Sequence, residues 1–144
     1  MHVENRLMPD AAQLALLQAP GPDQPIIMVN LLKYRARAQY EDGRDAHLSG
    51  REAYQRYAVR VATLVEEYGG RVLFAGDVTG LSLGVVEPLW DEVALAQYPN
   101  RAALLRMSMS AQWRAAAVHR TAGLEGQLNI ETVSSMAIVL GAPA

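Results

Sequence analysis

The chain contains no cysteine, and this absence excludes disulfide bonds, thiolate metal ligands and a cysteine nucleophile. It also lacks a G-x-S-x-G elbow, a phosphate-binding P-loop and a G-x-G-x-x-G motif after a strand, which removes the common hydrolase and nucleotide-binding functions. The histidines His2, His47 and His119 are far apart, and none has a partner at the H-E-x-x-H spacing. We therefore expect neither a metal nor a cofactor.

A strong excess of charge of one sign is also missing. The formal net charge is −2, the isoelectric point is near 5.9, and the arginines are scattered among the acidic residues. Because nucleic-acid binding needs a basic surface, we expect no nucleic-acid partner. The apolar stretch around Leu14, Leu16 and Leu17 is too short for a signal or membrane segment, so we expect no membrane contact and a cytoplasmic protein. Lysine is almost absent, since Lys33 is the only one.

The remaining composition is that of a globular protein. The 144 residues include 51% hydrophobic and 19% charged residues, and a chain of this length buries enough surface for a full core. We expect a single domain over residues 1–144, with an N-terminal helical extension over residues 1–24. The C-terminal tail, residues 134–144, carries an apolar run at 136–140 that predicts an edge strand or an arm.

The clearest local signal is a helix start at Ser49. Glu52 follows three residues later, and the two side chains predict a capping box that satisfies free backbone donors of the first turn. Apolar and aromatic residues then recur at helical spacing as far as Tyr68, where Gly69 and Gly70 are expected to end the helix.

Periodicity and turn residues predict the other elements. The expected ranges are helix 9–18, strand 26–32, helix 49–68, strand 71–79, strand 86–98, helix 101–107, a further helix over 110–123, and strand 128–133. After the N-terminal helix, the order is strand, helix, strand, strand, helix, strand. This is the split βαβ plan of the ferredoxin-like α+β fold, in which both helices cover one face of an antiparallel sheet.

Two of the expected strands are apolar on both faces, although two helices can cover only one face of the sheet. Strand 26–32 has Ile26, Met28 and Leu32 on one side and Ile27, Val29 and Leu31 on the other. Strand 86–98 has Trp90, Ala94, Ala96 and Tyr98 opposite Leu89, Val93 and Leu95. Because soluble monomers rarely expose such a large apolar face, we expect a second copy to cover it in a homodimer. The alternative is that the N-terminal helix covers this face within one chain.

Four segments of the sequence resemble a known family. They are MVNLLKY at 28–34, SGREAYQRY at 49–57, WDEVALAQYPNRAA at 90–103 and VHRTAGLEG at 118–126. They are similar to domain-of-unknown-function family 1330, in the dimeric α/β-barrel superfamily of ferredoxin-like proteins. The resemblance implies a dimer in which two sheets face each other. It implies no reaction, because the superfamily includes cofactor-free monooxygenases, isomerases of lactone type and heme-handling proteins.

Several polar residues are candidates for a ligand site, and each also has a structural explanation. His119, near the end of the last helix, is a candidate general acid or base, and Arg120 is a candidate clamp for a carboxylate. Alternatively, the two cap the helix and pair with Glu125 or Asp91. Asn30 interrupts an apolar strand, where its side chain either orients a ligand or bonds the neighbouring backbone.

Aromatic residues complete the candidate site. Tyr54 and Tyr57 lie on the core face of helix 49–68, where they pack or direct their hydroxyls toward a cavity. Trp90 precedes Asp91 and Glu92, and strand alternation places these two acids on opposite faces, which argues against a glycosidase-like carboxylate pair.

The sequence leaves two functions open. The first is a small dimeric protein that binds a small organic molecule between sheet and helices. If this protein is an enzyme, the expected chemistry is of the cofactor-free oxygenase or isomerase type, with His119 as the catalytic base. Its expected ligand-binding residues are Asn30, Tyr54, Tyr57, Trp90 and Arg120. The alternative is a non-catalytic dimeric module whose polar residues serve only structure or partner contacts.

Overall fold

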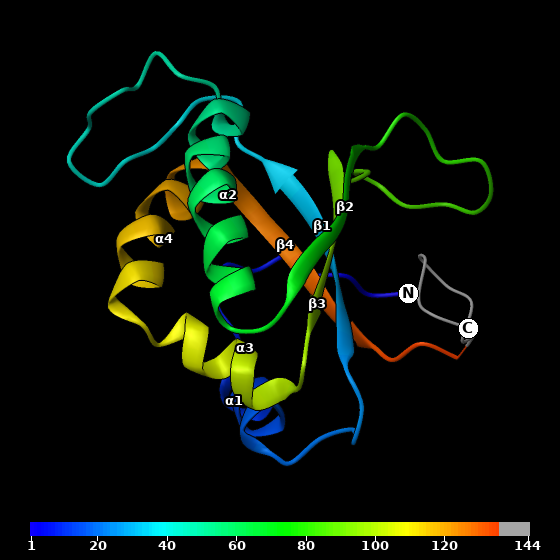
Figure 1. Ribbon diagram of the computed structural model, residues 1–144. Helices are drawn as coiled ribbons and strands as arrows, with labels where there is room; N and C mark the ends of the chain where they lie inside the picture. Colours follow the sequence, from blue (N-terminus) through cyan, green and yellow to red (C-terminus); the bar gives the residue numbers. More distant parts are fainter. Residues whose placement is uncertain (136–144) are drawn as a thin grey trace.

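The computed structural model of the protein describes residues 1–135. Its elements are α1 (Ala11–Gln18), β1 (Ile26–Tyr34), α2 (Gly50–Glu67), β2 (Arg71–Asp77), β3 (Glu92–Tyr98), α3 (Arg101–Ser108), α4 (Ala111–Gly123) and β4 (Leu124–Thr132). After the extra helix α1, they follow the predicted order, with the second crossover helix divided into α3 and α4 (Figure 1). The predicted ferredoxin-like α+β fold is confirmed.

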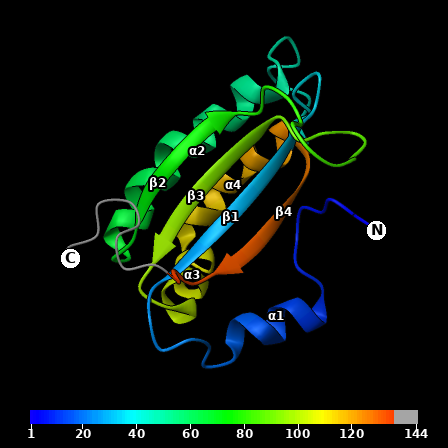
Figure 2. The ribbon, with the colours of Figure 1, turned by 90° about the vertical axis from the view of Figure 1, so that its right-hand side faces the viewer.

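The sheet is antiparallel, and its four strands lie in the order β2-β3-β1-β4. Figure 2 shows the sheet in front of α2 and α4, which cover its other face. Alternation along β1 places Ile26, Met28 and Leu32 under the helices, where they are 0%, 6% and 0% exposed. Ile26 and Met28 pack in the main core with Val65 of α2 and Met107 of α3. Full burial of side chains of this size contributes about 1.5–3 kcal/mol each to stability.

The predicted caps begin and end the helices. The Ser49 hydroxyl accepts from the Glu52 N–H at 3.0 Å, and the Glu52 carboxylate accepts from the Ser49 N–H at 2.9 Å. These hydrogen bonds hold the pKa of Glu52 below its usual value. Beyond the end of α2, Gly69 has a φ of 85°, a conformation that favours glycine. At the start of α4, Ser110 accepts from the Trp113 N–H at 3.1 Å.

Several strand boundaries differ from the prediction. β3 begins at Glu92 rather than at residue 86, because residues 78–91 form a loop closed by a 2.9 Å hydrogen bond from the Val78 N–H to the Asp91 carbonyl. β4 begins at Leu124, ahead of the predicted residue 128. The predicted edge strand or arm at 136–140 lies outside the described residues. Within residues 1–135, no helix is long and apolar enough to span a membrane.

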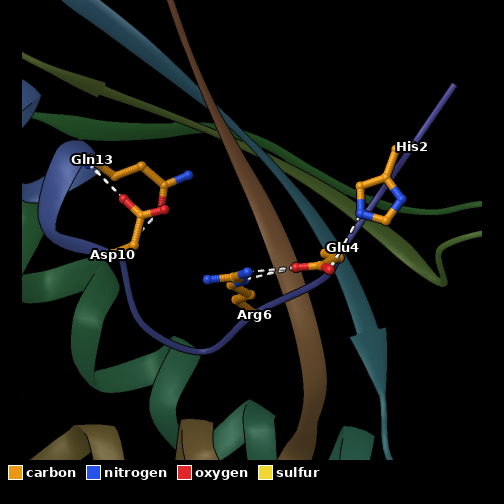
Figure 3. Close-up of polar contacts among 5 residues, drawn as sticks. All are labelled: His2, Glu4, Arg6, Asp10 and Gln13. Atoms are coloured by element: carbon orange, nitrogen blue, oxygen red, sulfur yellow. Dashed lines mark hydrogen bonds and ion pairs between the residues drawn. The ribbon is translucent and has the colours of Figure 1, made fainter.

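The N-terminal segment runs along the outer edge of β4. The backbones of Arg6 and Gln127 pair through hydrogen bonds of 3.1 and 3.0 Å. Glu4 lies between His2 and Arg6 and contacts both side chains, His2 at 3.2 Å and Arg6 at 2.5 Å (Figure 3). These contacts extend the sheet by a short, exposed and charged edge.

Helix α1 lies at one end of the molecule. It begins at a capping box between Asp10 and Gln13 (Figure 3) and packs against α3. Arg101 of α3 donates to the Leu16 carbonyl at 3.2 Å, which joins the two helices. Because α1 lies below the end of the sheet and not across it (Figure 2), the alternative in which it covers the second sheet face is wrong.

The sheet face opposite the helices is apolar, as predicted, and we call it the open face. It carries Ile27, Val29 and Leu31 of β1, Phe74 of β2, Val93 and Leu95 of β3, and Leu128 and Ile130 of β4. Phe74 and Ile130 are 52% and 46% exposed. No element of residues 1–135 crosses in front of these strands in Figure 2.

Candidate functional site

His119 turns from α4 toward the loop between β1 and α2. The side chain is buried, and its Nδ1 lies 2.6 Å from the hydroxyl oxygen of Tyr40 in that loop. The two rings meet edge to face, with centroids 5.5 Å apart. The carboxyl end of α4 is closed by a different contact, a hydrogen bond from the Leu124 N–H to the Arg120 carbonyl.

The neighbours of Tyr40 define the protonation of His119. Arg56, which also pairs with Asp45 at 2.8 Å, donates to the Tyr40 oxygen at 3.2 Å. The Tyr40 proton is therefore directed to Nδ1 of His119, and this network assigns the imidazole proton to Nε2. Burial lowers the pKa of His119, and the charges of Arg60 and Arg56 lower it further, so the ring is neutral at pH 7.

Arg120 turns the other way, toward the sheet. It is 8% exposed, and its Nε donates to Oε1 of Gln127 on β4 at 3.2 Å. Among the described residues, it forms no ion pair with a carboxylate. The pairing with Glu125 or Asp91 considered from the sequence is not formed, and Asp91 accepts from Lys33 at 3.4 Å instead.

Asn30 holds Gln127 in place. Its Nδ2 donates to the carbonyls of Ala94 at 3.1 Å and Met28 at 3.3 Å, and its Oδ1 accepts from Nε2 of Gln127 at 3.4 Å. The same Nε2 contacts Oδ1 of Asn129. The nitrogen of Gln127 is thus occupied on the sheet, and its oxygen is left to face the guanidinium. Asn30 thus bonds the neighbouring backbone, and it also orients Gln127, which in turn contacts Arg120.

Tyr54 and Tyr57 belong to a row of aromatic rings between helices and sheet. Ring centroids are 5.5 Å apart for Tyr34 and Tyr54, 5.3 Å for Tyr54 and Tyr57, and 6.3 Å for Tyr57 and Trp113. Burial raises the pKa of Tyr54 and of Tyr57, and the positive charge of Arg120 opposes that rise in both. Arg120 and these tyrosines therefore share one buried region.

Trp90 lies apart from the other candidates. Its Nε1 donates to Oδ1 of Asn5 at 2.7 Å, and Asn5 lies against Gly126. Gly126 pairs with Lys33 at the end of the open face, and Lys33 donates to the Leu89 carbonyl at 3.0 Å. Trp90 is thus on the side of the sheet away from the helices. It precedes β3, so the strand alternation assumed for it does not apply.

Two residues of the site were missed from the sequence. Gln127 had a detectable signal, because Gln127, Asn129 and Glu131 alternate on β4 and form a polar row on the helix-covered face. Tyr40 had none, since it lies in a polar loop without periodicity.

A groove of about 800 Å³ lies between the β1–α2 loop and α4. Its lining residues are Gln39, Tyr40, Glu41, Asp42, Arg44, Arg114, Ala117, Val118, Thr121 and Ala122. Acidic and basic side chains are balanced along it, so its charge selects no class of ligand. Within the described part of the chain, no group of histidine and carboxylate side chains is arranged to hold a metal ion.

These features define the class of the molecule as a ferredoxin-like α+β protein with a buried arginine between helices and sheet. The chain belongs to the family described as "Domain of unknown function (DUF1330)", whose model matches residues 45–133. The family predicted from the sequence is confirmed. Among curated proteins, none matches the chain.

Solved structures show the same fold. The RPA0582 protein of unknown function from Rhodopseudomonas palustris is 30% identical, with a TM-score of 0.82 over 92% of this chain and 99% of its own. Methylated RPA0582 is 32% identical, with a TM-score of 0.83 over 92% and 96% of the two chains. Hydroxynitrile lyase from Passiflora edulis is 8% identical, with a TM-score of 0.57 over 80% and 98%, and this likeness concerns the fold alone.

Proposed function

We propose that this protein is a homodimer that binds a small organic anion between its helices and its sheet, with Arg120 as the residue that receives the negative charge. The observation that carries the proposal is the burial of Arg120 without a carboxylate partner in residues 1–135. A guanidinium carries its positive charge throughout the stable pH range of proteins, so the charge is present at this site. An anion from outside the chain would balance it.

The size of the charge penalty favours this explanation. Holding a charged guanidinium in a largely buried place costs free energy, and a hydrogen bond to a neutral group offsets only about 1.5–3 kcal/mol of that cost. Gln127 occupies Nε of Arg120. The two terminal nitrogens have no hydrogen-bond partner in the described residues, and their planar geometry matches the two oxygens of a carboxylate.

The surroundings of Arg120 favour a ligand with an apolar, aromatic body. Tyr54 and Tyr57 present their rings in the same buried region, and Trp113 continues the row. Aromatic rings pair favourably with one another at such centroid distances, beyond the gain from burying their surface. A small aromatic monocarboxylate combines both features.

The geometry supports binding more strongly than catalysis. A general base needs an unprotonated atom within reach of the substrate, whereas the unprotonated Nδ1 of His119 is occupied by the Tyr40 hydroxyl. The catalytic role of His119 stays a prediction. We expect His119→Ala to lower the melting temperature and leave anion binding unchanged. If the His119→Ala variant kept the wild-type melting temperature but lost anion binding, the result would favour the predicted functional role of His119.

The homodimer is supported by the open face. Its apolar side chains extend over all four strands, and a two-fold axis places the same patch of each copy against the other. Lys33 lies at one end of this surface, so an interface over the central strands would contain no buried charge.

Thermal unfolding with benzoate tests anion binding, and benzamide serves as an uncharged control of the same shape. A ligand that binds only the native state raises the melting temperature. We expect benzoate to raise it, benzamide to leave it unchanged, and Arg120→Met to abolish the benzoate effect. A missing benzoate shift, an equal benzamide shift, or an undiminished shift in the variant would each contradict the proposal.

The second candidate, a non-catalytic structural module, is favoured by the internal partners of His119 and Asn30. Arg120→Met without ligand separates the two functions. If Arg120 is kept for a ligand, removing a buried unpaired charge raises the melting temperature of the unliganded protein. If Arg120 serves the fold alone, the same substitution lowers it.

A further inference from the structure

The β2–β3 loop, residues 78–91, exposes apolar side chains far from the core. At its tip, Leu81, Leu83 and Val85 are 45%, 88% and 87% exposed. The base of the loop is closed by the Val78–Asp91 hydrogen bond at 2.9 Å. We call these three side chains the loop tip. Exposed leucine and valine side chains gathered in one loop mark a contact surface rather than a part of the core.

The loop projects on the same side of the sheet as the open face. In Figure 1, it extends away from the sheet on the side opposite α2 and α4. In Figure 2, it stands beside the upper end of the strands, toward the edge where the N-terminal segment runs. A second sheet laid on the open face would therefore pass alongside the loop.

The area of the open face can be compared with the area that a stable dimer interface buries. Four strands about 4.8 Å apart and about 23 Å long have a footprint of about 440 Å². A stable, specific interface buries about 800 Å² of accessible surface on each partner, and the flat footprint of the sheet is about half of this value. A leucine or valine side chain carries on the order of 100 Å² of apolar surface. The loop tip of each copy, together with the surface that it covers on the other, would add apolar area to that buried between the two sheets.

We propose that the loop tip is a clasp that packs on the rim of the second copy when two open faces meet. This inference rests on the homodimer in the proposed function and adds a contact outside the sheets. A membrane surface is the less favoured partner, because the loop contains Glu87 and Asp91 but no lysine or arginine, whereas anionic lipids attract basic segments. The clasp contributes hydrophobic area, and the open faces set the two-fold arrangement.

Sedimentation equilibrium on the full chain tests the clasp with the double variant Leu83→Ser, Val85→Ser. The matched control is Val59→Ser, which removes an equally apolar side chain, 73% exposed, from α2 on the helix side. We expect the wild type to be dimeric, the double variant to dissociate at least tenfold more readily, and the control to match the wild type. A wild-type monomer would overturn the homodimer and the clasp together. A double variant with the wild-type dissociation constant would overturn the clasp and leave the homodimer standing.

Photo-crosslinking gives an independent measurement that does not depend on stability. The chain has no cysteine, so Leu83→Cys and Val59→Cys each carry one site for benzophenone maleimide. We expect irradiation to produce covalent dimers from the label at position 83 and none from the label at position 59. Covalent dimers from both positions, or from neither, would contradict the clasp. If vesicles of phosphatidylserine pull down the wild type but not the double variant, the loop tip binds membranes and the clasp is wrong.

Discussion

Nε of Arg120 donates to Oε1 of Gln127 at 3.2 Å, across the space between α4 and β4. Asn30 accepts from the other end of the same amide at 3.4 Å. This contact joins the helix layer to the sheet at a polar point within an apolar core. The chemical group at position 127 therefore sets how much of the Arg120 charge is balanced within the chain.

Gln127→Glu is expected to abolish the stabilisation by benzoate. The new carboxylate lies where the amide oxygen now faces Arg120, so it forms a charge-assisted hydrogen bond and supplies the missing anion internally. The measurement is the melting temperature with and without benzoate. Gln127→Met is the control, because it leaves the Arg120 charge unbalanced and keeps the response. A Gln127→Glu variant that responds as strongly as the wild type would show that benzoate binds elsewhere.

The buried position of His119 near several arginines makes stability depend on pH. Burial, followed by the charges of Arg60 and Arg56, lowers the pKa of folded His119 below its usual 6.5, so the unfolded chain binds the proton more readily. The stability contributed by neutral His119 is fully present above pH 6.5 and is lost as the pH falls toward the folded pKa. The arginines repel the added charge, while Asp45 attracts it and reduces the effect.

We therefore expect the free energy of unfolding to fall between about pH 7.5 and about pH 5.5, and to fall less in His119→Gln. Urea unfolding at the two pH values measures both differences. The comparison with the variant removes the contribution of carboxylates that titrate in the same range. Equal pH dependence in the two proteins would mean that His119 has the same pKa folded and unfolded.

Gly123→Ala is expected to destabilise the packing of α2 against α4. A Cβ at position 123 would lie 2.4 Å from the Gly50 carbonyl oxygen and 2.8 Å from the Tyr54 backbone nitrogen. Because backbone atoms cannot yield without separating the helices, we expect a loss of about 1–3 kcal/mol in the free energy of unfolding, measured with urea. Gly80→Ala is the control, since a Cβ there meets nothing within 4 Å. A similar loss in both variants would show that close helix contact is not the cause.

Local sequence signals predicted the elements that depend on neighbours in the chain. Ser49 and Glu52 lie within one turn, so their capping box is visible in the sequence and forms as expected. The same holds for Val29 and Leu31, because strand alternation alone places them on the face opposite Met28. The two apolar sheet faces followed from this rule.

Contacts between distant residues were not predictable in the same way. Tyr40 and His119 are 79 positions apart, and only the packing of the loop on α4 brings them together. Val86 is apolar like a strand residue, yet it lies in the β2–β3 loop, so apolar character alone placed the strand start too early. Because the predicted strand extended through Trp90, alternation placed this residue on the helix-covered face, whereas it lies on the opposite side of the sheet.

Leu95→Lys is expected to convert the proposed homodimer into a folded monomer. Leu95 pairs with Val29 on the two central strands of the open face, so its side chain points away from the helix-covered core. A second open face laid against it would bury two unpaired lysine charges near the two-fold axis, which costs several kcal/mol for each ion. In the monomer, the same charge is in water and costs little, so the far-ultraviolet circular dichroism should match that of the wild type.

Val118→Lys, at a position 47% exposed on α4, is the control and should stay dimeric in sedimentation equilibrium. If Leu95→Lys dimerised as tightly as the wild type, the two copies would have to meet through another surface, because no apolar interface tolerates that pair of charges at its centre.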